Sequence, residues 1–407
     1  MIGFGIVIPV LPLYAEGSLF GATGHQLAWI VGIYSLLQVV CAPIIGKISD
    51  RVGRRPVLIM SILGTAVGFS VLGAATTVKM LLIGRIIDGV SGGNISTAMA
   101  CIADVTTKEN RSRNMGLVGA AFGLGFMLGP ALGGRLSTQI QDAHGLFSFL
   151  NPLYHSLNPF LTVHTPFYFA AALALLNALL VWRHLPETLT PEVRARAREK
   201  ASLSEVFGGG RTPTIVIVLL SQISGITGFS VMTALFAIFC KHRYGYDAGQ
   251  VGYVLTYVGF LGVLMQGGVV RRLLVRPIEK PLAIIGTAVL AASLGALAFL
   301  PVGSGLGLLL LVCTGISVGN SLSTPTLNGL ASRAVDAHAQ GRLMGLMQSA
   351  GGLARFLGPM LAFKLIEFDG TNAYGYWAFI ASAGLLALDC LLLCALRVPP
   401  PPVEKAA

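Results

Sequence analysis

Two charged residues stand inside a strongly apolar stretch of the sequence, where each needs a physical reason to be present. Arg85 and Asp88 lie three residues apart and therefore share one face of a predicted helix. A carboxylate beside a guanidinium in such a setting can take up and release a proton as the balance between burial and pairing changes. We interpret this pair as the candidate for proton coupling, and a static ion pair that only stabilises the fold is the alternative.

A second group combines aromatic rings and carboxamides within apolar stretches. Such a mixture suits a cavity for an amphipathic, partly aromatic small molecule. Hydrogen bonding between helices is the alternative for each member, and a structural role is favoured for Arg355. The candidate cavity residues are Tyr34, Gln38, Gln222, Phe229, Tyr253, Tyr257, Asn320, Thr324, Gln348 and Arg355.

The composition places these residues in a membrane protein. Apolar residues make up 54% of the 407 residues and charged residues 11%, whereas about a quarter of a typical soluble domain is charged. The mean hydropathy is +0.76. A water-soluble fold of this length would lack the charge to cover its surface, so we expect a chain that crosses the lipid bilayer many times.

Twelve apolar stretches have about the length needed to cross a hydrocarbon layer, and the first of them is short. They divide into two sets of six around a charged segment. We expect an all-α membrane protein with bundles over 1–184 and 213–398, a linker over 185–212 and a tail over 399–407. The predicted spans are 1–15, 26–45, 57–75, 80–102, 115–135, 165–182, 213–239, 248–270, 281–300, 305–330, 343–366 and 374–396.

The positions of the charges explain the net charge of +11. Most of the 28 Lys and Arg residues fall in alternate loops, which include the loop that carries Lys47 and Arg51. Positive charge gathers on the cytoplasmic side of membrane proteins, so both termini and the linker are predicted to be cytoplasmic. The charge therefore signals topology and does not indicate nucleic acid binding.

No enzymatic or metal-binding arrangement is visible in the sequence. The six cysteines lie in or at the ends of predicted spans, where a thiol behaves as a small apolar side chain. No Cys or His cluster has the spacing of metal ligands. We expect no catalytic residue, no metal and no cofactor.

The two halves of the chain repeat each other in three places. The segment 46–56 (GKISDRVGRRP) corresponds to 267–277 (GGVVRRLLVRP), 89–94 to 315–320, and 115–130 to 344–359. A parallel duplication is typical of transporters whose two six-helix halves rock about a site near the middle of the membrane.

These motifs resemble a known family. GKISDRVGRRP is similar to the loop 2–3 signature of the major facilitator superfamily, and GLGFMLGPALGG (123–134) resembles the span 5 motif of its drug/proton antiporters. The segment 81–106 resembles span 4 of the tetracycline-efflux-like branch. The resemblance implies twelve transmembrane helices in two pseudo-symmetric bundles and a monomer in the bacterial inner membrane. It also implies two partners, protons and a small-molecule substrate.

The resemblance also implies a conformational latch on the cytoplasmic face. Asp50 should hold the two halves together there, and Arg54 should pair with Asp104, with solvated topology charges as the alternative. Because Arg271 stands at the position that corresponds to Asp50, we expect a one-sided latch. Pro56 is expected at the first helical position of span 3. The latch residues are Gly46, Asp50, Arg51, Gly53, Arg54, Arg55 and Asp104.

Small residues and a proline in span 5 predict a hinge or gate seal. Small side chains let helices approach closely, and a proline bends a helix by removing a backbone hydrogen bond. Ordinary tight packing is the alternative. The hinge residues and their copies in span 11 are Gly123, Gly129, Pro130, Gly358 and Pro359.

The sequence departs from the tetracycline-efflux-like pattern in span 1. That pattern has an acidic residue ahead of a proline-containing run, and here the run is Pro9–Pro12, so that position falls before Met1. If no residue ahead of Met1 supplies that acid, Asp88 is the expected proton site of the first half; the alternative is an acidic residue in a longer span 1. Asp389 is expected to reach the headgroup region, and 136–165 to form a dispensable interfacial flap.

We therefore expect a proton-coupled exporter of small amphipathic compounds, drugs included, that works by alternating access. One alternative is a facilitator or symporter for a polar metabolite such as a sugar. The other is a transporter-like protein that acts as a receptor or structural partner.

Overall fold

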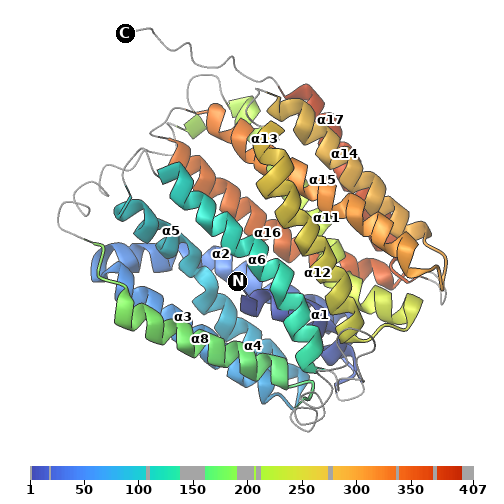
Figure 1. The fold of residues 1–407 in the computed structure, drawn as a ribbon, viewed down its shortest axis with the longest axis horizontal. Helices are drawn as coiled ribbons and strands as arrows, with labels where there is room; N and C mark the ends of the chain where they lie inside the picture. Colours follow the sequence, from blue (N-terminus) through green and yellow to red (C-terminus); the bar gives the residue numbers. More distant parts are fainter. Residues whose placement is uncertain are drawn as a thin grey trace.

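The structure, a computed structural model, describes residues 2–17, 20–106, 111–137, 161–189, 206–207, 212–273, 278–335, 339–369 and 374–396. In these ranges it consists almost entirely of helices, with no strand. The helices of the first half, blue to green in Figure 1, lie beside those of the second half, yellow to red.

Each predicted span overlaps a helix. In the first half the fourth span is broken by a short 3₁₀ turn, Gly92–Asn94, into α4 and α5. The helices of this half are α1 (Ile2–Glu16), α2 (Gly24–Val52), α3 (Arg54–Gly73), α4 (Val78–Ser91), α5 (Ile95–Asp104), α6 (Arg111–Ser137) and α8 (Thr165–His184).

In the second half the eighth span ends in a π-helix, Met265–Val270, followed by the short α13 (Arg271–Leu273). The other helices are α11 (Thr212–Tyr244), α12 (Ala248–Leu264), α14 (Glu279–Phe299), α15 (Leu306–Arg333), α16 (Gln340–Ile366) and α17 (Tyr376–Ala395). Within the described ranges, eight helices are long and apolar enough to cross a membrane.

The helix starts repeat between the halves as the sequence does. Thr23 accepts a hydrogen bond from the Gln26 backbone N–H, and the Gln26 side chain accepts one from the Thr23 backbone. Asp247 and Gln250 form the same reciprocal pair at the start of α12. These capping boxes satisfy N–H groups that a helix start leaves unpaired, so both halves begin their second span with the same device.

Helix packing follows the duplication. In the first half α6 packs on α1, and in the second half the corresponding α16 packs on α11. The halves meet where α6 packs on α12 and α2 packs on α16. A Cβ atom on Gly129 would lie 2.5 Å from Gly5 Cα, and one on Gly358 would lie 3.0 Å from the Val231 backbone nitrogen. Gly129 and Gly358, two of the predicted hinge glycines, therefore permit close helix contacts at matching places in the two halves.

The segment 46–56 is almost entirely helical, which corrects the predicted loop. The last turns of α2 extend to Val52, Gly53 alone makes the turn, and α3 begins at Arg54. Gly53 has φ +125°, a conformation that other residues rarely adopt. Pro56 is the third residue of α3 and not the first. The N–H groups of the first helical turn have no partner within the helix, so a proline at this position costs no hydrogen bond.

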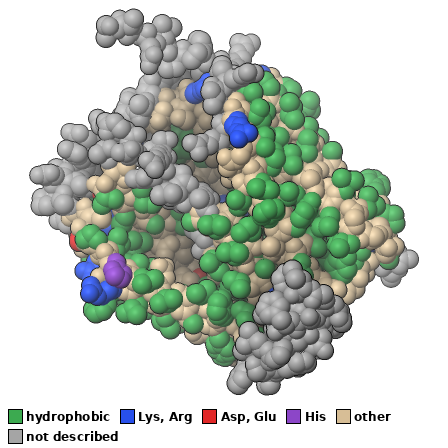
Figure 2. Space-filling model, viewed as in Figure 1, with side chains coloured by type: hydrophobic (Ala, Val, Ile, Leu, Met, Phe, Trp, Pro, Cys, Tyr) green, Lys and Arg blue, Asp and Glu red, His purple; other side chains and the backbone are tan. Residues whose placement is uncertain are grey.

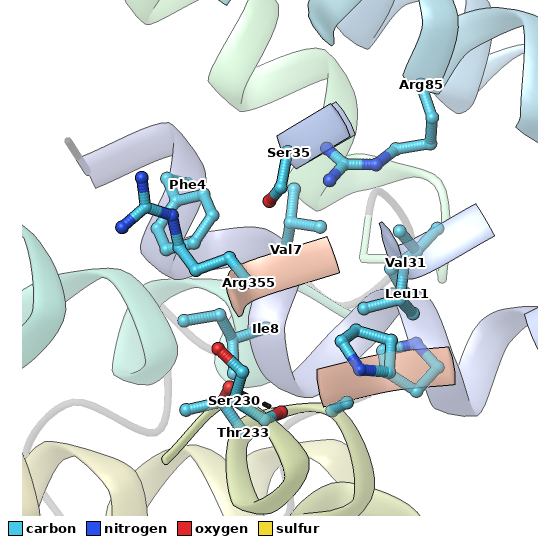
Figure 3. Close-up of a pocket in the computed structure, with 13 residues that line it drawn as sticks. Phe4, Val7, Ile8, Leu11, Val31, Ser35, Arg85, Ser230, Thr233 and Arg355 are labelled. Carbon is cyan, nitrogen blue, oxygen red and sulfur yellow. Dashed lines mark hydrogen bonds between the residues drawn. The ribbon is translucent and has the colours of Figure 1, made fainter. Parts of the chain in front are cut away.

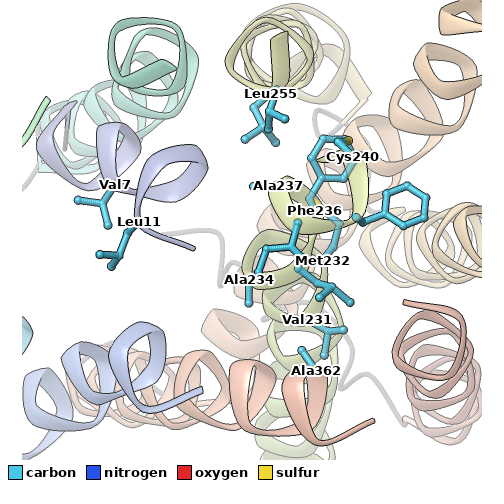
Figure 4. Close-up of a cluster of buried hydrophobic side chains, with 14 of the residues drawn as sticks. Val7, Leu11, Val231, Met232, Ala234, Phe236, Ala237, Cys240, Leu255 and Ala362 are labelled. Carbon is cyan, nitrogen blue, oxygen red and sulfur yellow. The ribbon is translucent and has the colours of Figure 1, made fainter. Parts of the chain in front are cut away.

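One apolar core joins the two halves at the end of the molecule where α1 ends and α11 reaches Tyr244. We call this end the Glu16 side, and the opposite end, where α2 meets α3, the Asp50 side. Figure 4 shows Val7 and Leu11 of α1 on one side of Ala234 and Phe236 of α11, with Leu255 of α12 nearby. The core thus holds α1, α11 and α12 together on the Glu16 side.

The outer surface is apolar, as a bilayer requires. Figure 2 shows hydrophobic side chains over most of the right-hand part of the visible face, with Lys and Arg at its left and upper margins. Leu311, Leu391 and Met60 are among the exposed large hydrophobic residues. The predicted flap lies largely outside the described residues, but its last part does not: His164 Nδ1 lies 2.9 Å from the Tyr14 hydroxyl and 2.8 Å from the Gly73 carbonyl oxygen.

We predict that Gly129→Ala lowers the thermal stability of the protein, because the added methyl group meets the Gly5 backbone, which cannot rotate away. Overpacking of this kind costs about 1–3 kcal/mol. The matched control is Gly384→Ala in α17, where an added Cβ has no described atom within 4 Å. Melting curves of the two variants in the same detergent test this, and equal melting temperatures would contradict it.

Candidate functional site

Arg85 and Asp88 form a buried ion pair. Arg85 Nη1 lies 3.0 Å from Asp88 Oδ2, and the two residues are 3% and 4% exposed. Arg85 Nε also donates to the Ile30 carbonyl oxygen at 3.2 Å. Its guanidinium carbon lies 4.5 Å from the centre of the Tyr34 ring. The pair therefore links α4 to α2 in an almost fully buried site, where pairing is what makes burial of both charges tolerable.

The break between α4 and α5 is held by the same group of residues. Gln38 Nε2 donates to the Gly92 carbonyl oxygen at 2.9 Å and to the Tyr34 hydroxyl at 3.2 Å. Gly92 itself packs against the Tyr34 ring, and a Cβ there would lie 2.9 Å from the hydroxyl oxygen. Tyr34 and Gln38 thus connect the ion pair to a weakened point of its helix.

A cavity of about 70 Å³ lies between the two halves. Figure 3 shows Arg85 and Arg355 reaching it from different helices, with Ser35 between them and the Phe4 ring beside Arg355. Residues from both halves line it: Phe4, Val7, Ile8, Leu11, Pro12, Val31, Ser35, Arg85, Ser230, Thr233, Ala234, Arg355 and Pro359. Arg355, Pro359 and Arg85 are the predicted site residues that the structure brings to this cavity.

Three other predicted cavity residues line a separate cavity of about 20 Å³ inside the second half. Gln222 of α11 lies there with Asn320 and Thr324 of α15, and Thr324 Oγ1 donates to Asn320 Oδ1 at 3.4 Å. A Cβ on Gly351 would lie 3.5 Å from both Gln222 Nε2 and Arg355 Nη1. Gln222 therefore stands between the two cavities.

The remaining predicted cavity residues lie elsewhere. Phe229 contacts Phe126 of the other half, with ring centres 6.2 Å apart. The Tyr257 hydroxyl pairs with Thr314 Oγ1 at 2.8 Å. Tyr253 is 46% exposed and lies under the Arg135 guanidinium, and Gln348 is exposed. None of these four lines either cavity.

Arg54 is the centre of the predicted latch. Its guanidinium lies 2.6 Å from Asp50 Oδ1 and 3.2 Å from Asp104 Oδ2, so the expected contact with Asp104 is present. Arg54 is 5% exposed and also donates to Ser49 Oγ at 3.0 Å. These contacts all lie within the first half and tie the end of α2 to the end of α5.

Glu187, which the sequence reasoning missed, completes this network. Its carboxylate accepts the backbone N–H groups of Arg54 at 2.8 Å and Arg55 at 3.1 Å, at the start of α3. Partial burial raises the pKa of Glu187, but backbone N–H groups, first that of Leu189 and then that of Arg54, outweigh it and lower the pKa. The carboxylate thus remains charged and caps a helix that has no side-chain cap of its own.

The second half has a counterpart to the Arg54–Asp104 pair. The expectation of a one-sided latch, which rests on Arg271 at the position of Asp50, stays a prediction. Arg333 at the end of α15 pairs with Glu279 at the start of α14. In the first half the base, Arg54, begins α3 and the acid, Asp104, ends α5. In the second half the acid stands at the helix start and the base at the helix end. The sequence alignment of the repeats hides the pair because the two charges change places.

The Glu16 side carries a cluster that crosses between the halves and that the sequence reasoning also missed. Lys241 Nζ lies 2.8 Å from Glu16 Oε2, and His242 Nε2 lies 3.1 Å from Glu16 Oε1. The His242 ring stacks on Tyr374 with centres 4.2 Å apart. Partial burial, followed by the Glu16 charge, raises the pKa of Tyr374, so the phenol stays protonated and can donate to Glu16.

The two halves also contact each other along α2 and α16. Trp29 of α2 and Phe356 of α16 have ring centres 5.8 Å apart, and Gly352 packs against Val39. On the Glu16 side the halves are joined by the Glu16 cluster and by the apolar core around α1 and α11.

Comparison with known proteins places the chain among transporters. The model of the Major Facilitator Superfamily matches residues 1–359. The chain is 31% identical to the tetracycline resistance protein, class C, of Escherichia coli, over 96% of this chain and 92% of that protein. It is 28% identical to the major facilitator superfamily domain-containing protein 10 of Mus musculus, over 90% of this chain and 77% of that protein.

Solved structures show the same fold. The human organic anion transporter MFSD10 (TETRAN) superposes with a TM-score of 0.69 at 24% identity, covering 96% of this chain and 95% of that one. A bacterial homolog of the human lysosomal transporter Spinster superposes with a TM-score of 0.74 at 15% identity, covering 97% and 93%.

We predict that Glu16→Gln loosens the contact between the halves on the Glu16 side, because it removes the charge that Lys241 and His242 share. The measurement is the rate at which a membrane-impermeant maleimide, added on the Glu16 side, labels Leu11→Cys in a background without other thiols. An exposed ion pair contributes about 0–1 kcal/mol, so labelling should rise by up to about five-fold. The control is Lys79→Gln, another charge near this side, and equal rates in both variants would contradict the prediction.

Proposed function

Because this chain belongs to the major facilitator superfamily, we propose that it exports small amphipathic compounds, drugs among them, in exchange for protons. The observation that carries the proposal is the buried Arg85–Asp88 pair beside a cavity between two halves. A charge pair that the second half lacks at the corresponding positions, Leu311 and Thr314, is not needed by the duplicated fold. It is therefore available for a function.

The pair supplies a mechanism for proton coupling. In the closed pair, Arg85 stabilises the Asp88 carboxylate against the cost of burial. A movement that lets water reach the pair or separates it changes that balance, and Asp88 then exchanges its proton with one side of the membrane. Cation contact with the Tyr34 ring and the Gln38 bond to Gly92 connect the pair to the helix break where such a movement costs least.

Alternating access follows from the two ends of the molecule. On the positive-inside argument, the Asp50 side is cytoplasmic and the Glu16 side faces outward, with both termini in the cytoplasm. In the outward-open state the Glu16 contacts break and the Asp50 side closes, and Asp50 then engages the start of α16 in the other half. Gly129, Pro130, Gly358 and Pro359 are the hinges about which α6 and α16 move. The close packing at Gly129 and Gly358 supports these hinges. The proposed transporter works as a monomer in the bacterial inner membrane.

The lining of the cavity favours a substrate with an apolar body and an acidic or electron-rich group. Arg355 lines it, and no ion pair to Arg355 is present among the described residues. Phe4, Val7 and Ile8 supply apolar walls. Tetracycline-like drugs are one candidate class, by similarity to the class C protein. Organic anions are the second, favoured by the two guanidinium groups and by the likeness to the human organic anion transporter MFSD10.

The first test is transport by the purified protein in proteoliposomes. Inside-out vesicles with an acidic lumen should accumulate tetracycline or a fluorescent organic anion, and a protonophore should abolish the accumulation. Uptake that needs an acidic exterior would instead indicate a symporter for a polar metabolite. Binding without any flux would indicate a receptor.

We further predict that Asp88→Asn uncouples transport. The amide cannot exchange a proton, so gradient-driven accumulation should disappear while substrate counterflow at equal pH is retained. Arg85→Ala should lose both, because it leaves the Asp88 carboxylate without its counter-ion, at a cost of about 3–5 kcal/mol. Both fluxes are measured in the same vesicles, and accumulation against a gradient by Asp88→Asn would place the proton site elsewhere.

A further inference from the structure

A second carboxyl group lies buried within the second half. Asp389 of α17 is 1% exposed, which corrects the expectation that it reaches the headgroup region. It lies six residues before the end of α17, and α17 packs against both α11 and α14. Its Oδ1 atom is buried and makes no hydrogen bond in the structure. A carboxyl group in this position calls for a chemical reason of its own.

The charged groups around this carboxyl group can be followed only within the described part of the chain, and there no cation compensates it. Among the described residues Asp389 takes part in no ion pair, and the group that faces it is the Ser221 hydroxyl of α11, which is itself buried without meeting hydrogen-bond geometry. The nearest base on α14, Lys280, donates instead to the Cys394 and Leu396 carbonyl oxygens. The other titratable neighbour is the Cys390 thiol on α17 itself. A charged carboxylate without a partner is very costly in such a site, whereas a neutral acid is not.

A polar route connects Asp389 to the space between the halves. Ser221 also lines the cavity of about 20 Å³, which is large enough for one water molecule. Gln222 lies on the same cavity and stands beside Arg355, which lines the cavity between the halves. The order is thus Arg355, Gln222, the small cavity, Ser221 and Asp389. Gly225, which also lines the small cavity, lies next to the carboxyl group: a Cβ added there would lie 3.7 Å from Asp389 Oδ2.

We infer that Asp389 is a proton-binding site of the second half, separate from the Arg85–Asp88 pair and reached from the cavity between the halves through Gln222 and Ser221. Uptake of a proton converts the carboxylate to a neutral acid, whose O–H can donate to Ser221, and release returns the proton along the same polar groups. That this site contributes to coupling rests on the proposed function, but its occupation by a proton does not.

The test detects the proton directly and needs no transport. Infrared spectra of the purified protein in lipid nanodiscs at neutral pH should show the C=O stretch of a protonated carboxyl group. The band should be lost in Asp389→Asn and kept in Asp88→Asn. Carbon-13 labelling of aspartate should shift it, which identifies the residue type.

An unchanged band in a folded Asp389→Asn protein would overturn the inference, as would the absence of the band from the wild type. Asn has the shape of the neutral acid, so its melting temperature should stay near that of the wild type; Asp389→Ser replaces it if it does not fold. A wild type that shows the Asp389 band but transports none of the tested drugs would retain this site while refuting the proposed function.

Discussion

The structure depends on one constraint: hydrocarbon offers no partner to a polar group, so each such group within the helices must find one inside the protein. The break between α4 and α5 is tolerated because Gln38 takes up the Gly92 carbonyl oxygen. Arg85 is tolerated because Asp88 and the Ile30 carbonyl oxygen accept its N–H groups. In the proposed mechanism, a polar group that has its partner in only one conformation is the kind of group that can bind a proton or the substrate in the other conformation.

The same constraint separates what the two halves share from what they do not. Close backbone packing at Gly129 and Gly358 recurs because each half must bury its fifth helix against its first. The pairs at the ends of the helices, Arg54–Asp104 and Arg333–Glu279, recur with exchanged charges because only their attraction matters for packing. The ion pair at Arg85 does not recur. Duplication thus preserved the scaffold and left the interior charges free to differ.

Much of the fold could be predicted from the sequence, because apolar length and glycine spacing are local properties. The spans, the repeat and the Arg85–Asp88 contact are of this kind. The Glu16–Lys241 and Glu187–Arg54 contacts could not be predicted, since their partners are more than a hundred residues apart and no local pattern in the sequence pairs them. Asp389 was misplaced because its distance from the helix end suggested the headgroups, whereas its burial depends on how α17 packs on α11 and α14.

The two ends of the molecule are held by contacts of different kinds, and this difference bears on the alternating access that we propose. On the Glu16 side, ion pairs cross between the halves, but Lys241 is 43% exposed there, so each pair contributes only about 0–1 kcal/mol. On the Asp50 side, the Arg54 network lies within one half and survives separation. Shifting a two-state equilibrium from about 1:99 to about 99:1 needs a change of about 5.5 kcal/mol in the free-energy difference between the states. The Glu16 cluster supplies only a fraction of that, so most of the preference for one state must come from apolar contact around α11 and from the charge state of the buried carboxyl groups.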